Sequence, residues 1–407
     1  MTAAAVRPAT LAGQLASWAT ALDPDAADLV LAERSLLDTV AVALAARAHP
    51  LRPIAALLPE AANWAAMGHV LDFDDLHMES TAHISVVCVA ATLAAGGDAR
   101  AYLAGAGVMA RLGSALGWSH YARGWHATCT AGAPAAAVAA CVAMGLDPEV
   151  TARAMALAVP AAGGVQRAFG TTAKPLQVGF AAAAGLRAAR LAAAGAGADP
   201  AALDDWLALV GGTAAQVAAA GPAVPGGLAI KLYPCCYALQ RPIAAMQGIT
   251  ADPGEVAGVV VRTPEGTVQP LIHHRPSTGL EGKFSLEYAL AATLLDGYPG
   301  FASFEDAAVR RPSARELVET VEVITSPGGA GLLDGELEVE VRLRDGTVRA
   351  ARLALPPGSP SQPPTPDQLQ AKLAACGEDV PGLLEGLSWG AAAALLRRQL
   401  PSSAAAS

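Results

Sequence analysis

The sequence predicts a mainly α-helical protein, with a large all-helical domain and a smaller α+β domain. Hydrophobic residues make up 53% and charged residues only 15% of the 407 residues. Much of the hydrophobic fraction is alanine, which favours closely packed helices over strands. Up to about residue 250, apolar residues recur at helical spacing. Beyond Asp252-Pro253-Gly254 the spacing changes to the alternation that is typical of strands.

Helices of the first domain are predicted from apolar periodicity and from the Gly, Pro and Asp residues that interrupt it. Thr172 is expected to cap the helix that carries Lys174 in its first turn. The expected helices span residues 11–22, 26–47, a short segment from 53, 84–95, 98–117, 134–144, 148–159, 173–194 and 237–248. Residues 1–250 are therefore assigned to the helical domain.

The second domain, residues 254–355, is predicted to be α+β. Strands are expected at 256–263, 317–326, 336–344 and 347–355, the last two forming a hairpin at Asp345-Gly346, with helices at 285–295 and 314–319. Helices at 366–375 and 380–396 are expected to return to the first domain, which they complete as residues 366–400. Residues 401–407 are expected to be a disordered tail.

Composition excludes several functions. The net charge is −9 and no basic run is present, so nucleic acid is not expected as a partner. Six cysteines without a C-x-x-C pair indicate a reducing compartment rather than a zinc or disulfide framework. The N-terminus lacks the pattern of a signal peptide, and the apolar runs are too short to span a membrane. These observations predict a cytoplasmic protein without membrane contact.

One stretch concentrates titratable residues in this apolar chain. Residues 68–83 hold three Asp, one Glu and three of the eight His. Apolar surroundings shift pKa values towards the working pH, as an acid–base site requires. The alternative is a loop whose carboxylates cap the next helix. A second polar and aromatic island, residues 118–128, is either another wall of the site or an ordinary loop.

Lysine is scarce, with four residues among the 27 Lys and Arg. Because lysine is a compact, titratable ammonium, it is expected where the planar guanidinium of arginine does not fit. Lys174 lies at a predicted helix N-terminus, where its charge opposes the helix dipole but suits an anion site. Lys372 is expected at the surface.

The remaining candidates have no recognisable cofactor, metal or nucleophile motif. Their chemistry suits an anionic substrate: lysines bind carboxylates, one histidine removes an α-proton, and a second histidine or a tyrosine returns a proton. The expected reaction is an elimination, decarboxylation or epimerisation without cofactor or metal. The candidates are Asp72, Asp74, Asp75, His77, His83, His126, Lys174, Lys231, Lys283 and Tyr288.

Six motifs in the same order resemble those of the MmgE/PrpD family, which includes methylcitrate dehydratase, cis-aconitate decarboxylase and iminodisuccinate epimerase. They cover nearly the whole chain. The motifs are H-x-L-D-F-D-D at residues 69–75, T-x-H-x-S at 81–85, G-W-H-x-T at 124–128, T-x-K-P-x-x-x-G at 172–179, K-x-Y-P-C-C at 231–236 and K-F-S-L-x-Y-A-x-A-x-x-L-L-D-G at 283–297.

The resemblance implies a helical domain that forms a homodimer, an α+β lid, and a site between them. It implies a cofactor-free lyase, a dehydratase or decarboxylase, acting on a small di- or tricarboxylate or related acid. An epimerase is the alternative, and a non-catalytic acid-binding homologue is the third possibility. The implied site residues are Asp72, His83, His126, Lys174, Lys231 and Tyr288, with Lys283 beside them on the lid.

Three departures from the family pattern bear on the substrate. Ile84 replaces the usual proline after His83. Gln240 replaces a usual histidine and is followed by Arg241, so a neutral amide and a guanidinium are expected to contact the substrate carboxylates. The segment from residue 47 to residue 60 is shorter than usual by a few tens of residues.

Overall fold

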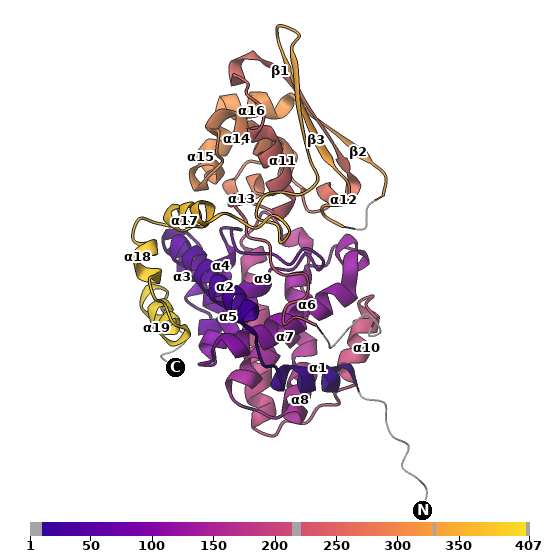
Figure 1. The fold of residues 1–407 in the computed structure, drawn as a ribbon, viewed down its shortest axis with the longest axis vertical. Helices are drawn as coiled ribbons and strands as arrows, with labels where there is room; N and C mark the ends of the chain where they lie inside the picture. The colour runs from indigo at the N-terminus through magenta and orange to yellow at the C-terminus, as the bar shows by residue number, and fades with distance from the viewer. Residues whose placement is uncertain (1–9, 214–220, 329–330, 404–407) are drawn as a thin grey trace, which may run out of the picture.

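A computed structural model describes residues 10–213, 221–328 and 331–403. Its helices fall into two groups, one below and one beside a small sheet (Figure 1). The buried apolar residues form two clusters. We call the cluster within residues 11–228 and 376–400 the helical core, and the second, within residues 229–341 with Leu76 and Phe169, the sheet core.

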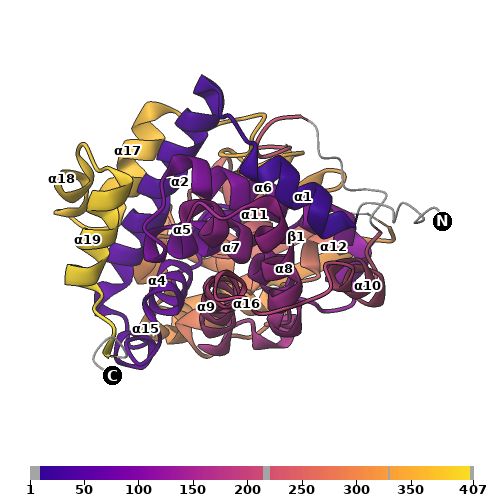
Figure 2. The ribbon, with the colours of Figure 1, turned by 90° about the horizontal axis from the view of Figure 1, so that it is seen from below.

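Helix α7 lies in the middle of the helical core (Figure 2). Every residue from Ala127 to Val142 is buried, so this helix is apolar on all sides, as a fully enclosed helix must be. The helices of this core are α1 (Leu11–Thr20), α2 (Ala26–Ala45), α3 (Arg52–Ala55), α4 (Glu60–His69), α5 (Ile84–Ala94), α6 (Ala99–Ala122), α7 (Ala127–Ala143), α8 (Pro148–Ala158), α9 (Ala173–Ala193) and α10 (Ala202–Leu209).

Small residues let the neighbours of α7 approach closely. A Cβ atom on Gly105 of α6 would lie 2.6 Å from the Cβ of Ala139, and one on Gly185 of α9 would lie 2.4 Å from the Cβ of Ala136. Both separations are too short for real carbon atoms, so these positions require glycine. The abundance of alanine and glycine therefore sets the spacing of the helices.

The sheet core is built on a four-stranded mixed sheet in the order β2-β1-β3-β4. Strand β1 pairs in parallel with β2 and antiparallel with β3, and β3 pairs antiparallel with β4. The strands are β1 (Val256–Pro264), β2 (Val321–Ser326), β3 (Leu337–Leu343) and β4 (Val348–Leu353). The helices beside them are α11 (Tyr237–Gln247), α12 (Glu265–Val268), α13 (Gly279–Gly282), α14 (Leu286–Asp296), α15 (Asp306–Arg310) and α16 (Pro312–Glu319). The predicted fold class, mainly α with a smaller α+β part, is confirmed.

Helix α11 differs from its predicted assignment. The sequence groups it with the helical domain of residues 1–250, but it packs on β3, β4 and α14. Its buried residues Leu239, Ile243 and Met246 belong to the sheet core. Their apolar periodicity predicts a helix but carries no information about which core the helix joins. The change from one core to the other falls near residue 229, ahead of the predicted boundary.

The C-terminal helices run back beside α2 and α5 (Figure 1). They are α17 (Pro366–Ala375), α18 (Val380–Leu384) and α19 (Trp389–Gln399). The prediction of one helix over residues 380–396 is wrong, because the chain breaks at Gly386, whose φ is +63°. Within the expected disordered tail, the Ser403 N–H donates to the Ala56 carbonyl at 2.7 Å, and residues 404–407 lie outside the described part.

Other details of the helices also differ. The Thr172 side chain makes no capping hydrogen bond to α9. Helix α6 continues through a kink at Gly117, with a φ of +63°, into the predicted island of residues 118–128. Among the described residues, no helix combines the length and apolarity that a membrane span requires.

A buried hydrogen-bond chain ties the segment after α4 to α5 and α6. The carboxyl of Asp75 contacts the Ser85 hydroxyl at 2.5 Å and accepts the Ser85 N–H at 3.3 Å. The Ser85 hydroxyl in turn lies 2.7 Å from the Tyr102 hydroxyl. Burial, with the nearby charge of Asp38, raises the pKa of Asp75 to about 7. Below about pH 7 the carboxyl is mostly protonated and is a neutral member of this chain.

This raised pKa makes stability depend on pH. Between about pH 4 and pH 7 the folded state keeps the Asp75 proton that the unfolded chain has lost, so Asp75 costs stability as pH rises through that window. Asp75→Asn keeps a side chain that can hydrogen-bond but removes the titrating group. We expect its free energy of unfolding, measured with urea, to fall less than that of the wild type between pH 5 and pH 8. Parallel pH profiles would contradict this, and the exposed Asp23→Asn is the control.

Candidate functional site

Two residues hold an unusual backbone conformation at one place. Asp72 has a φ of +54° and Thr81 a φ of +56°, and within the described ranges they are the non-glycine residues with positive φ. Such a conformation costs a side-chain-bearing residue about 1–3 kcal/mol and persists only where the surroundings enforce it. Both residues line the same buried cavity. The strain therefore coincides with the stretch that the sequence singles out.

The cavity lies between the two cores and has a volume of about 20 Å³. This is room for about one water molecule, which is too little for a carboxylic acid in this arrangement. Residues of the helical and sheet cores line it together, namely Asp72, Leu76, Thr81, His83, Tyr121, His126, Phe169, Lys174, Cys236, Tyr237, Phe284 and Leu332.

Two lysines compensate the charge of the buried Asp72 carboxylate. The Lys231 ammonium donates to its Oδ1 atom at 2.5 Å and to its main-chain carbonyl at 2.9 Å. The Lys174 ammonium lies 3.2 Å from the same Oδ1. Burial alone would raise the pKa of Asp72, but Lys174 and then Lys231 outweigh it and hold the pKa well below its ordinary value. Asp72 is therefore ionised at any physiological pH.

The other two lysines bind the carbonyl groups on either side of Asp72. The Lys283 ammonium donates to the Leu71 carbonyl at 2.7 Å, and the Lys372 ammonium donates to the Phe73 carbonyl at 2.8 Å. All four lysines of the chain thus meet at residues 71–73, which we call the lysine-bound turn. The expectation that Lys372 lies at the surface is wrong, because it is 2% exposed.

Asp74 orients two imidazoles. Its Oδ2 atom accepts a hydrogen bond from Nδ1 of His69 at 2.8 Å and lies 3.1 Å from Nδ1 of His83. The second contact is electrostatic, because it lacks hydrogen-bond geometry. Burial would raise the pKa of Asp74, but His69 and His83 hold it well below its ordinary value. Burial lowers the pKa of His83 to about 3, so this imidazole is neutral at pH 7.

His126 is held by a side-chain amide. The Gln177 Nε2 atom lies 2.6 Å from Nδ1 of His126. The orientation of that amide is fixed by Val165, whose N–H donates to Gln177 Oε1 at 3.2 Å and whose carbonyl accepts from Nε2 at 3.3 Å. Burial, followed by the charge of Lys174, lowers the pKa of His126 well below its ordinary value. The neutral ring therefore accepts at Nδ1 and carries its proton on Nε2.

Two aromatic rings enclose the ammonium of Lys174. It lies 5.3 Å from the ring centre of Phe169 and 5.0 Å from that of Phe284. The two rings stack on each other, and Phe169 also meets His126 edge to face. Lys174 is 5% exposed and, unlike Lys231, lines the cavity. It is therefore the ammonium best placed to meet an anion in the cavity.

Comparison with known families decides the relationship of this chain to other proteins. Residues 55–210 match the MmgE/PrpD N-terminal domain, and residues 233–383 match the MmgE/PrpD C-terminal domain. The chain belongs to the MmgE/PrpD family. The resemblance stated from the six motifs is confirmed.

Relatives of known name are similar at low identity. The cis-aconitate decarboxylase of Mus musculus is 27% identical over 251 residues, which are 56% of this chain and 50% of the mouse protein. That of Homo sapiens is 26% identical over 296 residues, 67% of this chain and 59% of the human protein. That of Aspergillus terreus is 26% identical over 354 residues, 76% of this chain and 71% of the fungal protein. The chain thus spans about half of the length of the mouse relative and three-fifths of the human one.

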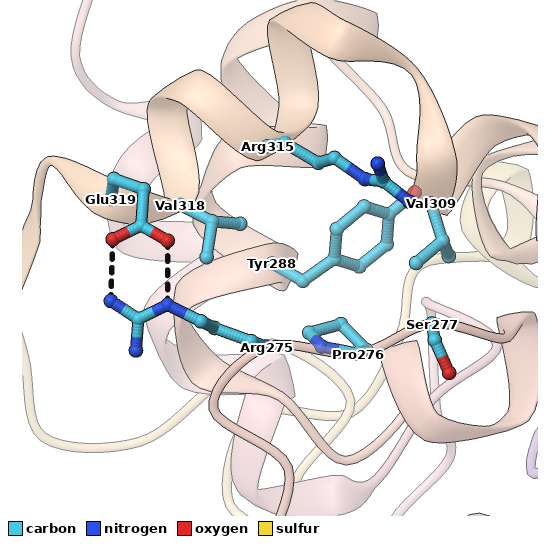
Figure 3. Close-up of a pocket in the computed structure, with 8 residues that line it drawn as sticks. All are labelled: Arg275, Pro276, Ser277, Tyr288, Val309, Arg315, Val318 and Glu319. Carbon is cyan, nitrogen blue, oxygen red and sulfur yellow. Dashed lines mark hydrogen bonds and ion pairs between the residues drawn. The ribbon is translucent and has the colours of Figure 1, made fainter.

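Of the site residues that the family resemblance implies, Asp72, His83, His126 and Lys174 line the cavity, and Lys231 contacts Asp72. Tyr288 does not. Its hydroxyl donates to the Ser303 carbonyl, and its ring lines a separate cavity of about 290 Å³ among the helices of the sheet core (Figure 3). That cavity has Arg275 and Glu319 as an ion pair at its rim but no histidine or lysine.

Gln240 and Arg241 also point away from the cavity. Gln240 accepts the N–H groups of Leu232 and Tyr233, both at 3.0 Å, so its amide organises the segment that carries Lys231. The Arg241 guanidinium donates to three carbonyls and to the Thr267 hydroxyl, and it is fully buried. The three carbonyls belong to Leu333, Gly335 and Ala354. Their predicted contact with the substrate is absent from this arrangement.

Sequence reasoning missed several residues of the site. The Tyr237 hydroxyl is buried without a hydrogen-bond partner and lines the cavity. Tyr121 and Cys236 line it as well. Gln177 follows Lys174 by three positions and so shares its face of α9, a spacing that would have pointed to it. Nothing in the local sequence distinguishes Tyr237 from Tyr288, because only the tertiary fold decides which ring reaches the cavity.

A group of four buried side chains could in principle hold a metal ion. The ligand atoms of His69, Asp72, Asp74 and His83 lie within 4.8 Å of one another. However, the ammonium groups of Lys231 and Lys174 already flank Asp72. A divalent cation placed there would be repelled by both ammonium groups. The residues present do not fit a metal centre.

The two lysines at Asp72 should differ in their contribution to stability. Lys231→Met removes the shorter bond and leaves the Asp72 carbonyl without its ammonium, so we expect unfolding free energy to fall by roughly 3 kcal/mol. Lys174→Met leaves the Lys231 contacts in place and should cost less stability. Urea unfolding of both variants measures the difference, and equal losses would contradict it.

Proposed function

We propose that the protein is a cofactor-independent acid–base enzyme, a lyase of the dehydratase or decarboxylase type that acts on a small di- or tricarboxylate or related acid by α-proton transfer. The observation that carries the proposal is a pair of neutral imidazoles, His83 and His126, that line the same cavity. A carboxylate lies at Nδ1 of the first and an amide N–H lies at Nδ1 of the second. The cavity also presents an ammonium, which suits a carboxylate.

His83 is proposed as the base. The ionised Asp74 lies 3.1 Å from Nδ1 of His83, and this charge favours a proton on Nδ1 because a lone pair there would face the carboxylate. The Nε2 atom, which lies farther from a carboxylate, 3.8 Å from Oδ1 of Asp72, then carries the lone pair. An imidazole oriented in this way by a carboxylate is the arrangement of an activated general base. Its low pKa keeps it unprotonated at neutral pH.

His126 is proposed as the acid. Because Gln177 donates to Nδ1, the neutral ring holds its proton on Nε2 and can donate it. His83 removes the α-proton, and His126 gives its Nε2 proton to the leaving group or to the opposite face of the substrate. The proton taken up by His83 then returns the His126 ring to its neutral form, so that both imidazoles are neutral again before the next turnover. This division of labour between the rings does not require Tyr288.

Lys174 is proposed to bind a substrate carboxylate. Its ammonium lines the cavity and meets the rings of Phe169 and Phe284 there. A carboxylate that approaches Lys174 would share it with Asp72, which keeps Lys231 as its second partner. Because Phe284 and Leu332 close the cavity from the sheet core, entry of the acid requires this core to move away and to return before catalysis.

The names of the relatives favour a lyase. The mouse, human and fungal relatives are cis-aconitate decarboxylases, and removal of CO₂ from an acid can use the same proton-donating group as a dehydration. An epimerase would need the same two imidazoles on opposite faces of the α-carbon and is the second candidate. A non-catalytic acid-binding protein would need Lys174 but not the ordered pair of imidazoles.

The substrate class can be tested by proton exchange. We expect the protein to catalyse reaction or α-deuterium exchange when it is incubated in D₂O with 2-methylcitrate, citrate, cis-aconitate or iminodisuccinate, followed by NMR. A new alkene or loss of CO₂ indicates a lyase, and exchange without net reaction indicates an epimerase. His83→Gln should abolish exchange while the protein stays folded. Binding without exchange for every acid would contradict the proposal in favour of an acid-binding protein.

The role of His126 depends on its tautomer, which Gln177 sets. We expect Gln177→Glu to move the proton from Nε2 to Nδ1, because the new carboxylate accepts a hydrogen bond where the amide donated one. Loss of general acid catalysis should lower kcat by about 10²-fold or more with little change in KM. The ¹⁵N shifts of His126 report the tautomer directly. An Nδ1-protonated His126 in the wild type would overturn the assignment.

A further inference from the structure

We propose that Lys372 is a positioning residue of the candidate site, acting through the main chain of the lysine-bound turn. The effect of Lys372 on catalysis rests on the function proposed above, whereas its effect on how Asp72 and Asp74 are held does not. Lys372 lies 299 positions away from Phe73 in the sequence, and neither the site motifs nor the proposed mechanism includes it.

The Lys372 ammonium makes three contacts at once. It donates to the Phe73 carbonyl at 2.8 Å, pairs with Oδ1 of Asp38 at 2.6 Å, and lies 4.3 Å from the centre of the Phe73 ring. Its side chain is 1% exposed and that of Asp38 is 5% exposed. Two of its three contacts are with one residue, and that residue lies between Asp72 and Asp74.

The carbonyl contact fixes the orientation of a peptide plane. The Phe73 C=O and the Asp74 N–H belong to one rigid peptide unit. Holding the carbonyl therefore restricts ψ of Phe73 and φ of Asp74, and with them the direction of the Asp74 side chain. Asp74 in turn contacts His69 and His83. A rotation of this peptide would carry the carboxylate away from Nδ1 of His83.

The position of the ammonium is itself well determined. Helix α17 begins with a capping box between Thr365 and Gln368, and it lies beside the helical core on the side of α2 (Figure 1). Asp38 belongs to α2. The ammonium is therefore held between two helices while it reaches the turn.

Stability alone does not account for this buried pair. Removing two charges from water costs several kcal/mol per ion, and a well-packed apolar pair is often as stable. Asp38 is also incompletely satisfied, because its Oδ2 atom has no hydrogen-bond partner. Burial raises the pKa of Asp38, although Lys372 opposes that rise. The contact that an apolar pair could not replace is the bond to the Phe73 carbonyl.

The test separates charge compensation from positioning. Lys372→Met leaves Asp38 buried without its ammonium and should lower both stability and activity. The double variant Lys372→Met/Asp38→Asn removes that unpaired charge, so its midpoint of unfolding should recover. Its kcat should stay about 10- to 100-fold low with KM within about twofold, because the turn is still unrestrained.

A spectroscopic readout keeps the test independent of the proposed reaction. In the double variant we expect the imidazole ¹H and ¹⁵N signals of His83 to shift. Those of His120 should not, because its ring bonds to Val210 and Thr130 away from the turn. If no acid reacts with the wild type but His83 shifts in this variant, the proposed function fails while the positioning role stands.

The opposite results overturn the proposal. Wild-type His83 signals and wild-type kcat in the double variant would show that Lys372 only neutralises Asp38. Asp38→Asn alone, which keeps the ammonium at the Phe73 carbonyl, should leave the His83 signals unchanged. A shift in this single variant would make Asp38 the positioning residue, and this comparison decides the question even if the double variant does not fold.

Discussion

The site depends on the compensation of one buried charge. Asp72 sits in a left-handed conformation inside an apolar core, where an unpaired carboxylate would be prohibitively costly. Lys231 and Lys174 make the ionised form favourable, and Lys283 and Lys372 bind the carbonyls on either side. These lysines come from segments far apart in the chain. The same contacts therefore hold the helical core, the sheet core and the C-terminal helices around one turn.

Close packing of the helices makes such a site possible. Alanine and glycine at the contacts of α7 let α6 and α9 approach without large side chains, so α9 presents Lys174 and Gln177 directly to the imidazole at the start of α7. Burial then lowers the pKa of both cavity histidines. A looser core would admit water and return those values towards neutrality. The low pKa values of the two histidines therefore depend on the close packing of the helices.

Much of the fold follows from the sequence, because helix periodicity and strand alternation are local. The β3–β4 hairpin follows from Asp345-Gly346, and Asp72, His83, His126 and Lys174 follow from motifs that the resemblance assigns. The sequence could not show which core α11 joins. It also placed Gln240, Arg241 and Tyr288 by family position, whereas their polar groups bind neighbouring carbonyls, amides and a hydroxyl. Such partners are set by tertiary contacts that no local pattern encodes.

The burial of every lysine has a practical consequence for chemical labelling. None of the four side chains belongs to a residue more than 5% exposed, so reagents that modify ε-amines meet no accessible lysine while the two cores are in contact. The amines of Lys174, Lys231 and Lys283 contact residues 71 and 72 where the two cores meet. Separation of the cores would expose these three amines. The rate of amine modification thus becomes a measure of how often the cores part.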